Sequence, residues 1–319
     1  MGAKYRRMAI YGLLGIIVLA GQALTTHSQR PATAPDQWEI VRQIEYDTIP
    51  KENLQGEIGR AYLRYLVSLA GFHTDTFGIT IGPDDDARFT TDGGQNWTKA
   101  PSELMCRYGL EIVDENVAWH CGNGGTRVTT NSGRTWQTVE PSECPNLSFL
   151  DAQLGWSASP TRLQATADGG ASWHTIALPP DIEEIATVAL RTPDDGYVLD
   201  TSGDLYVTED GGESWEAHSP GLLNTGERLI SGSISGPFTT MRFLDRLNGI
   251  VVFALSDRTV WSAITYDGGQ TWQRSEIQEL RDQSYYYHLF LSRDGRFLTV
   301  TDGYLNGENR SILLRYREG

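Results

Sequence analysis

The stretch TEDGGESW, residues 208–215, decides the fold because it recurs with small changes along the 319-residue chain. We call the shared pattern, Thr-x-Asp-x-Gly-x-x-Trp, the Asp motif. Its five copies are residues 90–97 (TTDGGQNW), 129–136 (TTNSGRTW), 166–173 (TADGGASW), 208–215 and 265–272 (TYDGGQTW). Successive tryptophans lie 39, 37, 42 and 57 residues apart. A period of about 40 residues is typical of a propeller blade or a solenoid unit.

A second pattern precedes the Asp motifs. It joins an apolar strand end, a polar turn and the start of a new strand, as in FLDAQLGW (residues 149–156) and FLDRLNGI (residues 243–250). Each unit therefore predicts four strands, which we name A to D, with the Asp motif between C and D. In the third unit we expect these strands near residues 147–151, 155–159, 162–167 and 172–178.

These units predict an all-β fold, a β-propeller of six blades with four antiparallel strands each. The units start near residues 60, 106, 144, 183, 236 and 285, and the sixth has no D strand of its own. The segment QWEIVRQIEYD, residues 37–47, resembles the D strands that begin at Trp173 and Trp215. We therefore expect an N-terminal strand to complete the last blade, which removes an exposed sheet edge. Seven blades are the alternative.

The Asp motif is interpreted as a structural turn. Its carboxylate can accept hydrogen bonds from nearby N–H groups, its glycine tolerates a positive φ, and its tryptophan supplies a large apolar surface. Catalysis or calcium binding would need five separate sites, whereas one structural role explains every copy. The residues given this role are Asp92, Trp97, Asn131, Trp136, Asp168, Trp173, Asp210, Trp215, Asp267 and Trp272.

The five copies resemble the Asp-box, or BNR, repeat of β-propeller proteins. The succession of FLDAQLGW and TADGGASW is most similar to the photosystem II stability and assembly factor-like family. That resemblance implies a non-catalytic scaffold that binds or assembles another protein, an arginine-rich binding patch and, typically, seven blades. Asp-boxes also occur in sialidases and polysaccharide hydrolases, so a glycan-acting enzyme or a lectin is the alternative function.

The net charge and the N-terminal segment narrow the possible partners and the location of the protein. A net charge of −15 argues against nucleic-acid binding, which needs a basic surface. Residues 1–23 join three basic residues to an apolar run that starts at Met8, which is typical of a signal peptide or, alternatively, a membrane anchor. We expect residues 24–36 to be a linker, residues 37–319 to form one propeller domain, and the protein to be extracytoplasmic: periplasmic, cell-surface or secreted.

The three cysteines could form a disulfide after export. Cys106 precedes strand A of the second blade and Cys121 follows strand B. Because antiparallel pairing brings these two strand ends together, we predict a Cys106–Cys121 disulfide. A disulfide between Cys121 and Cys144, or three reduced thiols, are the alternatives.

No catalytic residue, cofactor or metal site is predicted. The sequence has no G-x-S-x-G, P-loop or dinucleotide-binding pattern, and its histidines lack metal-ligand spacing. The arginine motif that sialidases carry before their first Asp-box has no counterpart between the predicted strands. A deep axial pocket with three convergent arginines would favour the enzyme, and a flat or plugged face would favour the scaffold.

We expect a ligand to bind the face formed by the B–C and D–A loops, at the opposite end of the blades from the Asp motif. The largest D–A insertion, residues 219–237, lies there. Arg107, Arg228, Arg281 and Tyr285 are predicted on or beside this face, and arginine with aromatic residues is typical of protein interfaces. The expected partner is a protein, membrane-associated or free, with a glycan as the alternative. We expect no nucleic acid and a monomer.

Overall fold

The computed structural model describes most of the chain after residue 37, and the structural statements below concern that part. The described residues are 38–45, 69–81, 86–103, 109–122, 125–139, 146–218, 221–230, 238–257, 259–281, 287–303 and 309–317. The predicted signal or anchor, the linker, Cys106, Arg107, Cys144 and Tyr285 lie outside them. Within the described ranges, no helix is both long and apolar enough to cross a membrane.

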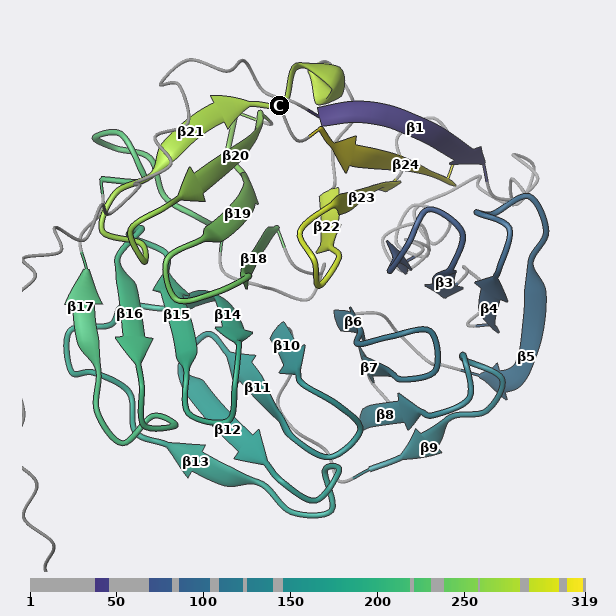
Figure 1. Ribbon diagram of the computed structural model, residues 1–319, viewed down its shortest axis with the longest axis horizontal. Coiled ribbons are helices and arrows are strands. Elements are labelled where there is room, and N and C mark those ends of the chain that lie inside the picture. Colours follow the sequence, from purple (N-terminus) through teal and green to yellow (C-terminus); the bar gives the residue numbers. More distant parts are fainter. Residues whose placement is uncertain are drawn as a thin grey trace, which may run out of the picture. The chain divides into compact units, whose positions relative to one another are not determined.

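Six four-stranded antiparallel sheets follow one another around a central axis and form a six-bladed β-propeller, as predicted (Figure 1). Blade 1 contains β2 (Leu69–Phe72), β3 (Gly78–Ile81), β4 (Asp86–Thr90) and β5 (Thr98–Glu103); blade 2 contains β6 (Gly109–Ile112), β7 (Ala118–Gly122), β8 (Gly125–Thr129) and β9 (Gln137–Thr138); blade 3 contains β10 (Asn146–Phe149), β11 (Gly155–Ser159), β12 (Arg162–Thr166) and β13 (His174–Ile176). Blade 4 contains β14 (Ile185–Leu190), β15 (Gly196–Asp200), β16 (Leu205–Thr208) and β17 (Glu216–His218); blade 5 contains β18 (Thr239–Phe243), β19 (Gly249–Ala254), β20 (Val260–Thr265) and β21 (Gln273–Glu276). A 3-10 helix, η2 (Gln278–Leu280), follows β21.

The last blade closes the ring with the N-terminal strand. Its strands are β22 (Tyr287–Leu291), β23 (Phe297–Gly303), β24 (Asn309–Tyr316) and β1 (Trp38–Glu45). β1 pairs antiparallel with β24, with Trp38 opposite Tyr316, and the two rings meet edge to face at 5.3 Å. The prediction that an N-terminal strand supplies the sixth D strand is therefore confirmed.

The inner strands are apolar on both faces because each blade is covered by its neighbours. Every residue of β14 (IATVAL) and of β19 (GIVVFA) is buried. The outer strands are shorter than predicted: the expected D strand at residues 172–178 is reduced to β13, and β9 has two residues. A D strand borders water along one edge, so a short strand limits the unpaired backbone that it exposes.

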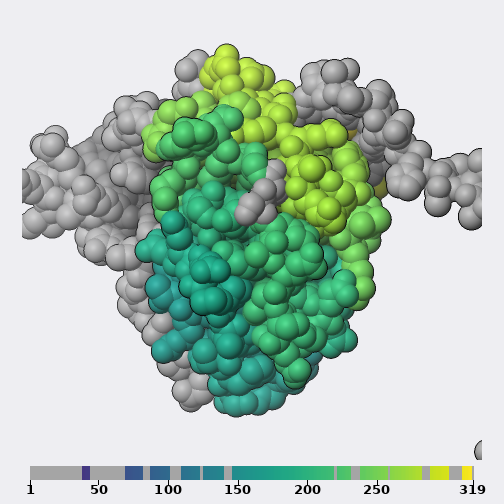
Figure 2. Space-filling view, turned by 90° about the vertical axis from the view of Figure 1, so that its left-hand side faces the viewer, coloured from purple at the N-terminus to yellow at the C-terminus, as the bar shows by residue number. Residues whose placement is uncertain are grey.

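Aromatic rings join neighbouring blades. Trp119 of β7 stacks on Phe149 of β10, with ring centres 3.8 Å apart, and Tyr197 of β15 stacks on Phe243 of β18 at 3.6 Å. Gly196 of β15 leaves room for a third such contact, since a Cβ there would lie 1.9 Å from the Trp156 ring of blade 3. Figure 2 looks onto the outer side of the ring, where the teal surface of the middle blades continues into the green surface of the later ones.

The two ends of the blades form different faces. The A–B turns and the Asp motifs lie at one end, which we call the turn face; the B–C and D–A loops form the loop face. In each of blades 1 to 5 the Asp motif donates a main-chain hydrogen bond to the A–B turn, as from Gly211 N–H to the Asp194 carbonyl (2.8 Å). The same bond joins Gly93 to Thr76, Ser132 to Asn116, Gly169 to Gln153 and Gly268 to Leu247. These bonds place the A–B turns of five blades in equivalent positions.

Candidate functional site

The Asp motifs close their turns with one repeated set of hydrogen bonds. In blade 4, the Thr208 hydroxyl donates to Asp210 Oδ1 (2.7 Å), Gly212 N–H donates to Thr208 Oγ1 (2.9 Å) and Ser214 N–H donates to Asp210 Oδ1 (2.9 Å). The equivalent bonds recur around Asp92, Asn131, Asp168 and Asp267.

The residue before each tryptophan adds one more hydrogen bond to the turn. The Asp motif as written from the sequence allows any residue at this position. The Ser214 hydroxyl donates to Asp210 Oδ2 (2.5 Å), and the side chains of Asn96, Ser172 and Thr271 donate the corresponding bond in their blades. In blade 2 the direction is reversed, since Asn131 Nδ2 donates to Thr135 Oγ1. Because all five residues are polar with a short side chain, the motif is better written Thr-x-Asp-x-Gly-x-(Ser/Thr/Asn)-Trp.

These hydrogen bonds determine the ionisation of the carboxylates. The Ser214 hydroxyl and N–H lower the pKa of Asp210 to about 2, and the Asn96 N–H and side chain lower that of Asp92 to about 2. A carboxylate with so low a pKa is a poor general base near neutral pH. Trp215, next in the chain, packs on Trp156 of blade 3 with ring centres 6.0 Å apart. The motif thus stabilises the turn and the contact between blades.

A pocket of about 470 Å³ opens on the turn face, where the A strands end near the axis. It is lined by residues of four blades: His73, Thr74, Ala189, Leu190, Arg191, Arg242, Phe243, Leu244, Arg293 and Asp294. We call it the arginine pocket, because Arg191, Arg242 and Arg293 line it and Asp294 is the one acidic residue of its described lining. In a chain with a net charge of −15, this pocket is the candidate site for an anionic group.

Arg242 forms the floor of the pocket. It lies on β18 and pairs with Glu111 of β6, which belongs to the blade on the opposite side of the ring. Both side chains are almost completely buried, and the Arg242 Nε atom has no acceptor. Burial raises the pKa of the Glu111 carboxyl, while the positive charges of Arg242 and Arg293 act in the opposite direction. The pair links blades 2 and 5 across the axis.

Arg293 crosses the axis in a similar way. Its guanidinium extends from the A–B turn of blade 6 to blade 3, where Nη1 donates to the carbonyls of Leu150 (2.6 Å) and Phe149 (3.3 Å). Within the described part of the chain it forms no ion pair. Its positive charge therefore remains uncompensated by any carboxylate in direct contact.

Arg191 shares its carboxylate with a second arginine. Asp195, which is 4% exposed, pairs with Arg191 and also accepts from Arg246 Nη2 at 2.7 Å. Two guanidinium groups thus meet one buried carboxylate, although Arg246 also reaches the exposed Glu209 (3.0 Å). The Arg191 Nε atom is buried and has no acceptor.

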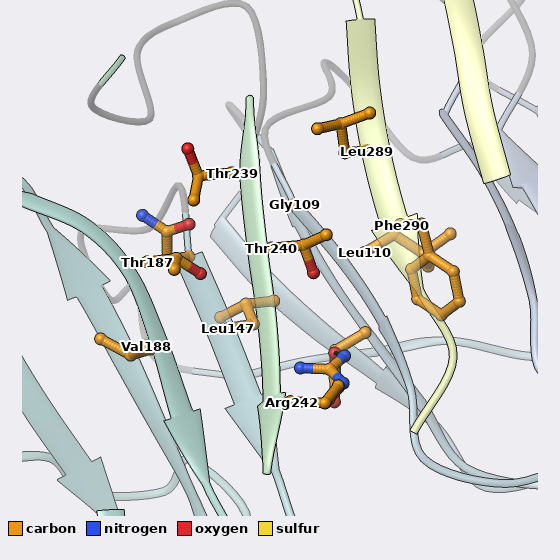
Figure 3. Close-up of a pocket in the computed structure, with 12 residues that line it drawn as sticks. Gly109, Leu110, Leu147, Thr187, Val188, Thr239, Thr240, Arg242, Leu289 and Phe290 are labelled. Carbon is orange, nitrogen blue, oxygen red and sulfur yellow. Dashed lines mark hydrogen bonds and ion pairs between the residues drawn. The ribbon is translucent and has the colours of Figure 1, made fainter. Parts of the chain in front are cut away.

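The axis beneath Arg242 is narrow. A cavity of about 30 Å³, which can hold about one water molecule, is lined by β6, β10, β14, β18 and β22. Figure 3 shows Arg242 at one end of β18, with Thr240 and Thr239 further along the same strand. The arginine pocket is therefore a bowl closed below by the Arg242–Glu111 pair. Three arginines line it, and among the described residues the cavity below them on the axis measures only about 30 Å³.

The loop face holds two of the predicted binding residues. Arg228 pairs with Glu183 and lines a second pocket, of about 480 Å³, with Glu184, Thr201, Leu229 and Ile230. Arg281 pairs with Glu276 (2.7 Å) and does not line that pocket. The structure thus places these two arginines apart, each beside a carboxylate that compensates its charge. Binding at the loop face stays a prediction.

Sequence reasoning missed the arginine pocket. Its arginines lie in or beside the A–B turns, which were read as simple connections between strands. The available signal was the variation among these turns: RTPDD (residues 191–195), LDRLN (residues 244–248) and SRDGR (residues 292–296) share little, whereas the Asp motifs are nearly identical.

Cys121 is buried at the end of β7 and is disulfide-bonded. Because both other cysteines lie outside the described residues, the Cys106–Cys121 pairing stays a prediction. In the ranges that the structure describes, no group of three or more His, Cys, Asp or Glu residues is placed to share a metal ion.

Comparisons with known proteins agree with the family that the repeat resembles, although no protein-family model matches the chain. The photosystem II stability/assembly factor HCF136 of Arabidopsis thaliana chloroplasts is 23% identical in an alignment 273 residues long, which covers 75% of this chain and 61% of that protein. The chain thus spans about three fifths of the length of this relative.

One solved structure with a TM-score above 0.5 shows the same fold. The structure described as YCF48 bound to D1 peptide has a TM-score of 0.52 and 18% identity, and the match covers 78% of this chain and 77% of that one. YCF48 from Cyanidioschyzon merolae matches with a TM-score of 0.46 and 14% identity over 76% of this chain and 79% of that one.

Proposed function

We propose that this chain is an exported, non-catalytic propeller of the Asp-box type, and that it binds an acidic segment of a partner protein in the arginine pocket. The observation that carries the proposal is the convergence of Arg191, Arg242 and Arg293 on one pocket in an acidic protein. Guanidinium groups bind carboxylates through paired, charge-assisted hydrogen bonds. Among the described residues, Arg293 forms no ion pair and therefore keeps its positive charge available at the pocket.

The comparisons support a protein as the ligand. YCF48 has been solved with a D1 peptide, and HCF136 carries the description of a stability and assembly factor. Although the net charge of −15 opposes the approach of an acidic partner, a local cluster of positive charge in a concave site attracts it at short range. Screening leaves this local attraction as the main electrostatic effect at physiological salt.

The test compares two double variants of the full-length chain, each of which loses two arginines. Arg191→Gln/Arg293→Gln removes two positive charges from the arginine pocket, and Arg228→Gln/Arg281→Gln removes two from the loop face. Crosslinking mass spectrometry from native membranes and extracts measures the partners of each. We expect the pocket variant to lose partner crosslinks at least about tenfold, since each lost charged hydrogen bond costs about 1.5–3 kcal/mol, and the loop-face variant to keep them.

The two variants separate the candidate faces. An unchanged set of partners in the pocket variant, with an unchanged melting temperature, would contradict the proposal. Loss confined to the loop-face variant would place the site at Arg228 and Arg281 instead.

A glycan-acting enzyme is the second candidate, because three converging arginines also suit a carboxylated sugar. Sialidases use a Tyr nucleophile and other glycosidases generally use two carboxyl groups, whereas the described lining of the arginine pocket has no Tyr and one carboxyl group, Asp294. Release of fluorophore from fluorogenic sialosides or other glycosides by the wild-type chain, abolished by Asp294→Asn, would establish the enzyme and overturn the non-catalytic proposal. We expect no release above the buffer control.

A further inference from the structure

The exposed apolar side chains of the protein are concentrated on blade 5. Among the described residues, four large apolar side chains are strongly exposed: Ile40 (41%), Leu244 (54%), Leu247 (57%) and Tyr266 (42%). The last three belong to the turn face of one blade: Leu244 and Leu247 to its A–B turn, and Tyr266 to its Asp motif. We call these three residues the apolar rim.

The backbone that carries the apolar rim is held in place. Leu244 N–H donates to the Asn248 carbonyl (2.8 Å), and Leu247 N–H donates to Asp245 Oδ1 (2.7 Å). Gly268 N–H, two residues after Tyr266, donates to the Leu247 carbonyl (2.9 Å). The exposed side chains therefore stand on a preorganised turn, which reduces the entropy that a ligand must overcome on binding.

The fold does not require an apolar residue at this position. The carbonyl that accepts the hydrogen bond from the Asp motif belongs to Leu247 in blade 5. In blades 1 to 4 the equivalent carbonyls belong to polar residues, Thr76, Asn116, Gln153 and Asp194. Four blades thus form the same turn with a polar side chain at the surface. The exposed leucine is therefore particular to blade 5 and is not required by the turn itself.

The apolar rim adjoins the arginine pocket at Leu244. Leu244 lines that pocket together with Arg191, Arg242 and Arg293, and Leu247 belongs to the same A–B turn. The one cation in this turn, Arg246, points to Asp195 and Glu209 of blade 4. A ligand carboxylate held by the arginines would therefore have its neighbouring groups against Leu244.

We propose that the apolar rim is the specificity subsite of the arginine pocket, and that it receives a large aliphatic or aromatic side chain next to the acidic group of the partner segment. This inference rests on the proposed function and adds the second chemical requirement of the ligand. A protein segment fits better than an anionic membrane, because exposed carboxylates lie in the same turn (Asp245), in the pocket lining (Asp294) and next to Arg246 (Glu209), and would repel a continuous negative surface.

The test is a selection of random twelve-residue peptides displayed against the purified full-length chain. We expect the wild type to enrich peptides in which a Leu, Ile, Phe or Tyr lies within a few residues of Asp or Glu. The variant Leu244→Ser/Leu247→Ser should still enrich acidic peptides, lose the apolar preference, and bind the best wild-type peptide about tenfold or more weakly, as expected for losing a buried leucine contact. Ile40→Ser, which removes an exposed apolar side chain from β1, outside the turn face, is the control.

Each other outcome has a definite meaning. Acidic peptides without an apolar preference, or a preference that survives in Leu244→Ser/Leu247→Ser, would overturn the apolar subsite and leave the proposed function standing. Acidic selection that is absent, or unaffected by Arg191→Gln/Arg293→Gln, would overturn the proposed function itself.

Two further arms examine other occupants of the rim. A dimer in sedimentation that dissociates in Leu244→Ser/Leu247→Ser would assign the rim to a second copy of the chain. Leucine-dependent flotation with phosphatidylglycerol vesicles, without peptide selection, would assign it to a membrane. Either result would overturn the peptide subsite. Because the substituted side chains are exposed, the variants should keep the wild-type melting temperature.

Discussion

The outer and inner turns of the same face differ in how far they repeat. The outer turns, formed by the Asp motifs, use one set of hydrogen bonds in five blades, with Asn131 as the single change of the acidic residue. The inner A–B turns keep only the main-chain bond to the Asp motif and vary in their side chains, from Thr76 in blade 1 to Leu247 in blade 5. The outer turns show what a blade needs in order to fold, and the inner turns show where the chain is free to differ.

This difference bears on where a ligand is proposed to bind. The sequence predicts binding at the loop face, whose B–C and D–A loops are its least regular part. The structure places the variable A–B turns on the same face as the Asp motifs, but nearer the axis (Figure 1). The radial position within the turn face therefore separates repeated turns from variable ones.

The largest expected loss of stability comes from breaking the buried ion pair between Arg242 and Glu111. Arg242→Met should lower the free energy of unfolding by about 3–5 kcal/mol, because it leaves the Glu111 carboxylate buried without its partner. Urea denaturation of the full-length chain measures this loss. Glu111→Leu/Arg242→Met should recover most of it, because a packed apolar pair needs no compensation. A double variant as unstable as Arg242→Met would show that the pair is not the cause.

The pH dependence of Arg242→Met follows from the raised pKa of Glu111. Because the folded pKa lies above the unfolded value near 4.5, the folded state binds the proton more tightly. Stability should therefore be greatest below about pH 4.5 and fall as the pH rises through the folded pKa. A loss of stability in Arg242→Met that is equal at pH 4 and pH 8 would contradict this account.

An intermediate loss of stability is expected when either of two adjacent glycines, Gly211 and Gly212 in the outer turn of blade 4, is replaced by alanine. Both have a positive φ, 72° at Gly211 and 97° at Gly212. A Cβ at Gly212 would lie 2.5 Å from the Ile176 side chain of blade 3, whereas at Gly211 the nearest atom is the Pro193 carbonyl at 3.4 Å. Gly212→Ala should thus cost about 2–4 kcal/mol from backbone strain and overpacking, and Gly211→Ala about 1–2 kcal/mol from strain alone. Equal losses in thermal unfolding would show that the interblade contact contributes nothing.

Much of the fold could be predicted because its determinants are local and repeated. One motif spaced by about a blade predicts the sheets, and the resemblance of the segment after Trp38 to the D strands predicts how the ring closes. The arginine pocket could not be found in this way, because each arginine belongs to a different unit and occurs once. Its contacts join opposite blades, Arg242 to Glu111 and Arg293 to Leu150, and no local pattern indicates that these residues meet.

The smallest expected effect tests whether the acidic charge of the outer turn matters at all. Asp210→Asn should leave the melting temperature at pH 7 within about 2 °C of the wild type, as for a neutral surface substitution. Blade 2 already forms the turn with an amide, since Asn131 Oδ1 accepts from Thr135 N–H (2.9 Å) and its Nδ2 donates to Thr135 Oγ1 (2.8 Å). Asp210→Ala, which removes the acceptor of Ser214 N–H, should be clearly less stable.

Lowering the pH tests the charge of the Asp210 carboxylate separately from the geometry of its hydrogen bonds. The folded pKa of about 2 lies below the ordinary value of 3.8, so the carboxylate stabilises the fold above pH 3.8 and this contribution is lost as the pH falls toward 2. Asp210→Asn should therefore reduce the slope of stability against pH within that window and leave it unchanged above. If instead Asp210→Asn were as unstable as Asp210→Ala at pH 7, the turn would depend on charge, and the amide of Asn131 would mark blade 2 as the weakest of the five outer turns.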